Sequence, residues 1–61
     1  MIEQIFTNYT NGNFDDMAEQ ITDYKGGRAE CFEHLKDFII HYGLKPETFM
    51  KITIMYFKKV D

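Results

Sequence analysis

The segment from Lys45 to Val60 constrains the fold most strongly, because it is the most apolar stretch of the chain. Pro46 and Glu47 suit the first turn of a helix, where the missing proline N–H is not needed and a carboxylate meets the positive end of the helix dipole. At helical spacing the large apolar residues cover an arc of roughly 200°. They are Phe49, Met50, Ile52, Ile54, Tyr56, Phe57 and Val60. A helix with so wide an apolar arc must lie between other helices or in a subunit interface.

A β-strand is the alternative for part of this segment. Every second residue from Met50 to Tyr56 is apolar, which is the pattern of a strand with one buried face. We favour a helix because of the Pro46-Glu47 start and the length of the apolar run. The choice between helix and strand stays open for residues 49–57.

Shorter amphipathic segments precede this one. The first has apolar residues at the i, i+3, i+4 and i+7 spacing of a helix. They are Ile2, Ile5, Phe6 and Tyr9. Gly12 can then adopt the left-handed conformation that ends a helix, and Asn13 can cap the next helix. We expect this second helix to run from Phe14 to about Tyr24, before the two glycines that follow Lys25.

The third helix is expected from Arg28 to Tyr42, with Gly43 as its C-terminal stop. Its apolar residues fall within about 120° of one another. They are Cys31, Phe32, Leu35, Phe38, Ile39 and Tyr42. Short turns make consecutive helices near neighbours, so the sequence predicts an all-α protein, a compact bundle of three to four short helices in a single domain over residues 1–61. The uncovered part of the C-terminal helix could form a twofold dimer contact.

The length of 61 residues limits what can stabilise this fold, because domains of this size are marginal on their own. Cys31 is the only cysteine, which excludes an internal disulfide and fits the reducing cytoplasm. No apolar run approaches the about 18 residues of a transmembrane helix, and polar residues interrupt the first apolar ones, unlike in a signal peptide. Aromatic side chains and self-association remain as sources of stability.

Acidic residues gather on the predicted second helix. Residues 1–24 contain five acidic residues and no Lys or Arg. Four of the carboxylates fall within an arc of about 100° opposite the apolar face. They are Asp15, Asp16, Glu19 and Asp23. Such a face can attract and orient a positively charged partner, although it can also serve only to keep a small protein soluble. Ile40, the one large apolar residue on the polar side of the third helix, is a further candidate contact.

The C-terminal segment is basic by contrast. Lys51, Lys58 and Lys59 are interleaved with Tyr56 and Phe57, a combination that also occurs in proteins that bind nucleic acids. This part of the chain has no arginine, although arginine is favoured for bidentate contacts with phosphates and bases. Lysines in a last turn also stabilise a helix C-terminus. Nucleic-acid binding is therefore the alternative function rather than the leading one.

Histidines and carboxylates share the polar face of the third helix, which carries Glu30, His34, Asp37 and His41. These residue types are ligands for zinc and similar metals. His34 and His41, however, lie two turns or roughly 10 Å apart along the axis. We therefore expect a polar face without a bound metal or other cofactor. Cys31 is expected to be a small core residue, because no base for a nucleophile is visible beside it.

Two stretches of the chain are similar to short reading frames that are common in bacteriophage and mobile-element genomes. They are Asn11-Gly12-Asn13-Phe14-Asp15-Asp16-Met17, which leads into an acidic helix, and the Met55-Tyr56-Phe57 ending. The resemblance implies a protein that binds a host protein, such as a defence nuclease, and blocks or redirects it. It carries over no functional residues.

Together these observations predict a non-enzymatic protein-binding module of the cytoplasm. Its acidic helical face would dock on a basic, nucleic-acid-binding host protein, and apolar residues left exposed beside that face would supply most of the affinity. No converging acid–base or nucleophile set for catalysis is visible in the sequence. We expect contact neither with a membrane nor directly with nucleic acid.

Overall fold

Four helices make up the computed structural model, which describes residues 2–60. The helices are α1 (Ile2–Thr10), α2 (Phe14–Thr22), α3 (Gly27–His41) and α4 (Pro46–Val60). Residues 2–60 contain no β-strand. The predicted all-α bundle is therefore confirmed, and the strand alternative for residues 49–57 is wrong.

The turn between α1 and α2 is closed by the backbone. Gly12 has a φ of 80°, and the Asn13 N–H donates a hydrogen bond of 2.8 Å to the carbonyl oxygen of Asn8. Asn13 occupies the N-cap position of α2, as predicted, but its side chain makes no capping hydrogen bond. Asp15 and Asp16 lie in the first turn of α2, where the helix dipole favours negative charge.

The turn between α3 and α4 depends on Gly43. With a φ of 65° this residue lies in the left-handed region, which a side chain disfavours. The Leu44 N–H donates to the carbonyl oxygen of Ile39 (2.9 Å), and the Gly43 N–H donates to that of Ile40 (3.1 Å). These two bonds form a Schellman motif, which ends α3 and reverses the chain before Pro46 begins α4.

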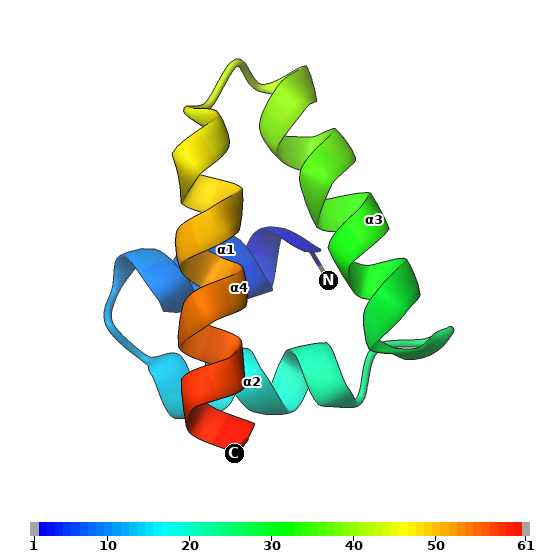
Figure 1. Ribbon diagram of the computed structural model, residues 1–61, viewed down its shortest axis with the longest axis vertical. Coiled ribbons are helices and arrows are strands. Elements are labelled where there is room, and N and C mark those ends of the chain that lie inside the picture. Colours follow the sequence, from blue (N-terminus) through cyan, green and yellow to red (C-terminus); the bar gives the residue numbers. More distant parts are fainter. Residues whose placement is uncertain (1, 61) are drawn as a thin grey trace.

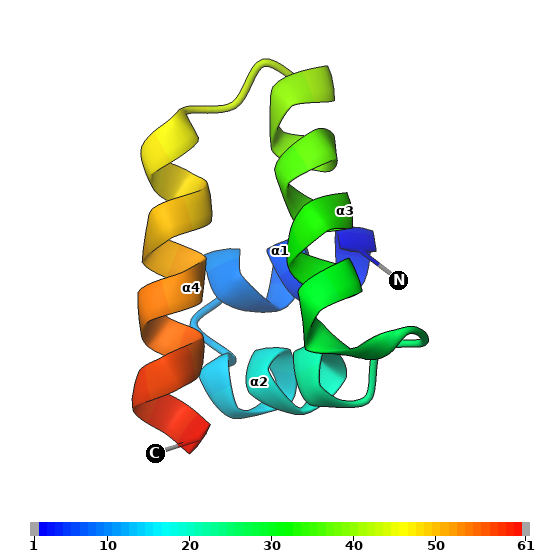
Figure 2. The same cartoon turned by 45° about the vertical axis from the view of Figure 1, so that its right-hand side comes forward.

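The four helices form two hairpins that cross each other (Figures 1 and 2). Helices α3 and α4 run antiparallel, and the shorter α1 and α2 lie across them. The turn end of the α3–α4 hairpin, residues 42–45, projects beyond α1 and α2 in both views. Helices α3 and α4 have 15 residues each, whereas α1 and α2 have nine each, so the short hairpin cannot cover the long one along its whole length.

The core lies where the hairpins cross and draws on all four helices. Its buried residues are Ile2, Ile5, Met17, Ala18, Ile21, Cys31, Leu35, Ile39, Ile52 and Tyr56. Partly buried aromatic side chains extend it. The ring of Phe32 on α3 lies 6.2 Å from that of Phe49 and 5.6 Å from that of Tyr56, measured between centroids. Phe32 therefore joins α3 to α4.

Helix α4 is only partly covered. Ile52 and Tyr56 point into the core and are 0% and 2% exposed, whereas Met50, Ile54 and Phe57 are 63%, 50% and 41% exposed. These three residues follow the i, i+4, i+7 spacing of one helical face. The wide apolar arc predicted for this helix thus has a buried side and an exposed side.

Candidate functional site

The predicted acidic face lies on the outside of α2. Its four carboxylate residues, Asp15, Asp16, Glu19 and Asp23, are all exposed. The opposite face of α2 is buried through Met17, Ala18 and Ile21. One carboxylate is already paired, because an oxygen of Asp15 lies 3.0 Å from Nζ of Lys59 at the end of α4.

The structure does not bring Ile40 to this acidic face. Ile40 is 67% exposed, near the end of α3 that projects away from α2 (Figure 1). The large apolar residues that remain exposed are Ile40, Tyr42, Met50, Ile54, Phe57 and Val60. Within residues 2–60 all of them belong to the α3–α4 hairpin or its turn, and none belongs to α2. The apolar contacts that we expected beside the acidic face are therefore elsewhere.

The three lysines of the nucleic-acid alternative do not share one face. Lys51 and Lys58 are seven residues apart, which places them on the same side of α4, next to Ile54. Lys59 points instead to Asp15 on α2. The lysine set is thus divided between two sides of the helix.

The two candidate metal ligands have other neighbours. Nδ1 of His34 lies 2.9 Å from the hydroxyl oxygen of Tyr24, and the ring of His41 meets that of Tyr42 edge-on at 4.9 Å. Desolvation raises the pKa of Tyr24, and the nearby Cys31 and Glu30 add to this rise. Over residues 2–60 no group of three or more His, Cys, Asp or Glu side chains could hold a metal ion.

Cys31 is a core residue, as predicted. Its side chain is fully buried, and this burial raises the pKa of the thiol to about 11. The thiolate is the reactive form of cysteine, so a thiol with this pKa is almost entirely unreactive near neutral pH. Cys31 therefore packs the core.

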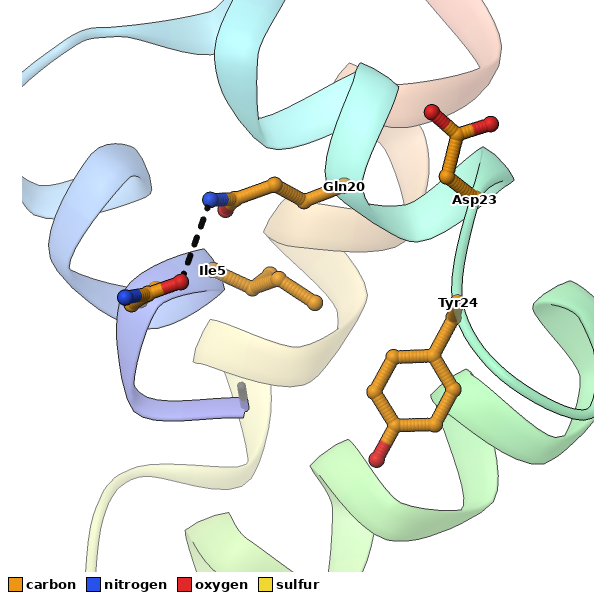
Figure 3. Close-up of a pocket in the computed structure, with 5 residues that line it drawn as sticks. Ile5, Gln20, Asp23 and Tyr24 are labelled. Carbon is orange, nitrogen blue, oxygen red and sulfur yellow. Dashed lines mark hydrogen bonds between the residues drawn. The ribbon is translucent and has the colours of Figure 1, made fainter.

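A small pocket of about 180 Å³ lies between α1 and the end of α2, lined by Gln4, Ile5, Gln20, Asp23 and Tyr24. Gln20 donates a hydrogen bond of 3.5 Å from Nε2 to Oε1 of Gln4 and accepts one of 2.9 Å from Nδ2 of Asn8. Figure 3 shows the side chains that line the pocket, with the carboxylate of Asp23 directed away from Ile5. The lining thus lacks a converging acid and base, and its amides bond to each other.

The exposed apolar residues of the α3–α4 hairpin form a more extended site. Near the turn an open groove of about 200 Å³ is lined by Lys36, Ile39, Ile40, Leu44, Pro46 and Phe49. Met50 follows Phe49 and lies one turn after Pro46, and Ile54 and Phe57 continue the row along α4. We call the exposed set the hairpin surface. It consists of Ile40, Pro46, Met50, Ile54 and Phe57.

Basic side chains border the hairpin surface from both helices. Lys36 lines the groove, and the guanidinium of Arg28 lies over the ring of Phe57, 5.8 Å from its centroid. Lys51 and Lys58 flank Ile54 one turn away on either side. Sequence reasoning found the apolar arc and the lysines of α4, but it missed the contribution of Arg28 and Lys36 from α3. The i, i+4 spacing of Lys36 and Ile40 could have indicated this contribution, because it places both side chains on one face of α3.

Comparison of the chain with protein-family models, with curated proteins and with solved structures found no match. In the part of the chain that the structure describes, no helix has the length and apolar character needed to cross a membrane. The site must therefore be interpreted from its own geometry.

Proposed function

We propose that the protein is a small, non-enzymatic protein-binding module and that the hairpin surface is its main contact site. The observation that carries this proposal is the exposed row of Met50, Ile54 and Phe57, which continues into the groove beside Ile40. Large contiguous apolar patches are uncommon on monomeric proteins and mark interaction sites. A few aromatic and arginine anchors carry most of the energy at protein interfaces, and the hairpin surface has Phe57 with Arg28 over it.

The acidic face of α2 has a supporting role in this proposal. Its carboxylates are exposed, but α2 leaves no large apolar side chain exposed beside them. Exposed charges change the rate and direction of association more than they change affinity. The acidic face therefore orients an approaching partner, while the hairpin surface supplies the contact. The expected setting is the cytoplasm, where Cys31 stays reduced.

A second candidate function uses the acidic face itself. Asp16, Glu19 and Asp23 are exposed on one side of a rigid helix, which favours contact with a basic, nucleic-acid-binding host protein. The resemblance to short phage proteins implies a blocking role of this kind. The nucleic-acid alternative now depends on Lys51 and Lys58, because Lys59 is paired with Asp15.

Paired variants distinguish these candidates. One variant carries Met50→Gln and Ile54→Gln on the hairpin surface, and the matched control carries Glu19→Gln and Asp23→Asn on the acidic face. Both pairs are exposed, so circular dichroism should show folded protein in each case. Each tagged protein is incubated with lysate of the source cells, with and without nuclease treatment, and retained proteins are identified by mass spectrometry.

The proposal expects one protein that the wild type and the acidic-face variant retain and that the hairpin-surface variant loses. The opposite pattern would support the acidic face as the docking site. Retention that disappears on nuclease treatment would support nucleic-acid binding through Lys51 and Lys58. A mass in solution that rises with concentration, and that the hairpin-surface variant does not show, would identify a second copy of the chain as the partner.

A further inference from the structure

The charge around the hairpin surface is opposite in sign to that of the whole protein. The net charge is −3 at pH 7. Five of the seven basic residues nevertheless border the hairpin surface or its groove, and they are Arg28, Lys36, Lys45, Lys51 and Lys58. Of the ten acidic residues, Glu47 lies within one turn of Met50, and Asp37 and Glu33 precede Ile40 by one and two turns on the same side of α3. The apolar site is therefore set in a mainly basic border.

The shape of the site suits a helix. Two antiparallel helices leave a groove between them at the turn end, and the exposed row on α4 has the spacing of helical side chains. A partner helix that packs into such a groove presents its own apolar anchors at the i, i+3, i+4 and i+7 spacing. The 15 residues of α4 extend over about 22 Å, so an occupant of similar length needs about 15 residues.

From these two observations we infer that the hairpin surface binds an acidic amphipathic helix of a partner protein, an inference that rests on the proposed function. The apolar side of that helix covers Met50, Ile54 and Phe57. Its flanking Glu or Asp side chains meet Lys51 and Lys58 on one side and Arg28 and Lys36 on the other. The guanidinium of Arg28 lies over Phe57, 5.8 Å from the ring centroid, and its N–H groups can donate to a carboxylate.

Charge also argues against a second copy as the occupant. A twofold dimer places the same patch of both copies in contact. The basic border of one hairpin surface would then face the basic border of the other, and like charges in contact suppress association. The acidic residues of α2 do not line the groove, because α2 crosses the hairpin at the end opposite its turn (Figure 2), where Asp15 pairs with Lys59.

Nucleic acid and anionic membranes fit the site less well. Base stacking needs aromatic rings, and the hairpin surface offers one, Phe57, over which the guanidinium of Arg28 already lies. Met50 and Ile54 offer no ring. Met50, Ile54 and Phe57 occupy an arc of about 60° on α4, or about 120° with Val60, and Glu47 interrupts the basic border of this row. A helix that lies on a membrane usually has a broad apolar face and a polar face rich in Lys and Arg.

The test uses two designed peptides of about 15 residues that differ only in charge. Both carry leucine at the spacing of one helical face, and the flanking positions are Glu in one peptide and Lys in its twin. Binding to the full-length protein is followed by backbone amide NMR shifts, which also locate the contact. We expect the acidic peptide to shift residues of the hairpin surface and to bind at least about tenfold more tightly than its twin, less so at high salt.

Charge-reversal variants sharpen the test. Lys51→Glu with Lys58→Glu should reverse the preference, so that the Lys peptide binds more tightly. The matched control, Lys25→Glu with Lys59→Glu, makes the same change of net charge at the two basic residues that do not border the site. It should keep the preference for the acidic peptide. At about 0.15 M salt, charges further than about 8 Å from the bound peptide are largely screened.

The outcomes separate this inference from the proposed function. Equal binding of both peptides at the hairpin surface, or tighter binding of the Lys peptide, would overturn the acidic helix and keep the hairpin surface as a protein-binding site. No shift of hairpin-surface amides with either peptide would overturn both. Shifts that grow with protein concentration alone would assign the surface to a second copy. Binding to vesicles of equimolar phosphatidylcholine and phosphatidylserine, lost in the Met50→Gln, Ile54→Gln variant, would assign it to a membrane.

Discussion

Helices α2 and α4 use their apolar residues in different ways. The inner face of α2, with Met17, Ala18 and Ile21, is buried, and its outer face is formed by carboxylates. Helix α4 buries Ile52 and Tyr56 but carries exposed apolar residues on its outer face as well. Burial in the core of the monomer explains where α2 has its apolar residues. On α4 it explains the buried apolar residues but not the exposed ones. The outer face of α4 therefore points to a contact that the isolated chain does not make.

The largest expected effect separates the two faces of α4. Ile52→Ala removes a fully buried side chain and should lower the free energy of unfolding by about 2–5 kcal/mol, which is most of the stability of a domain this small. Ile54→Ala, two residues away and half exposed, should lower it by about 1 kcal/mol or less. Urea denaturation of both variants measures the difference. An equal loss for Ile54→Ala would mean that the outer face is already covered in solution.

The pH dependence of stability tests whether Cys31, a core residue on α3, is buried. The pKa of its thiol is about 11 in the folded protein, above the about 8.5 of an exposed cysteine. The unfolded chain loses this proton first, so the contribution of Cys31 to stability is complete below about pH 8.5 and is lost as the pH rises through about 11. At pH 8 the thiol should react with Ellman's reagent at least about tenfold more slowly in the folded protein than in urea. Similar rates would contradict a buried Cys31.

A hydrogen bond of Tyr56 connects α4 to α2. Its hydroxyl lies 3.1 Å from Oγ1 of Thr22, and this bond is the main cause that lowers the pKa of Tyr56. Tyr56→Phe keeps the ring in the core and should lower the free energy of unfolding by about 0.5–1.5 kcal/mol. A double-mutant cycle with Thr22→Ala isolates the bond from other effects of each substitution. Strictly additive losses would show that it contributes nothing.

The ion pair between Lys59 and Asp15 should have the smallest effect. The two side chains are 40% and 88% exposed, and exposed pairs contribute about 0–1 kcal/mol. Lys59→Met should therefore lower stability slightly, and added salt should reduce the difference. Lys58→Met is the control, because it removes the same charge from the same end of α4. Equal losses in both variants would reflect only the helix dipole rather than the ion pair.

Much of the fold followed from local patterns in the sequence. Helix order, the stops at Gly12 and Gly43, and the start at Pro46 were predicted, because each depends on residues within one or two turns. The C-terminal end of α2 was predicted two residues late, at Tyr24 instead of Thr22. Tyr42 was assigned to the apolar stripe of α3, yet it is exposed, because it lies at the end of the helix beyond the covering helices.

The sequence by itself determined which segments are helical, which face of each helix is apolar, and that α2 is acidic, because these properties repeat with the period of a single helix. Only the tertiary structure decided which side of α4 remains exposed, that Arg28 and Lys36 of α3 join the basic border, and that Lys59 pairs with Asp15. Those contacts join residues far apart in the chain. They depend on the relative lengths of the two hairpins and on how the hairpins cross. The residue pattern within one helix contains no information about either.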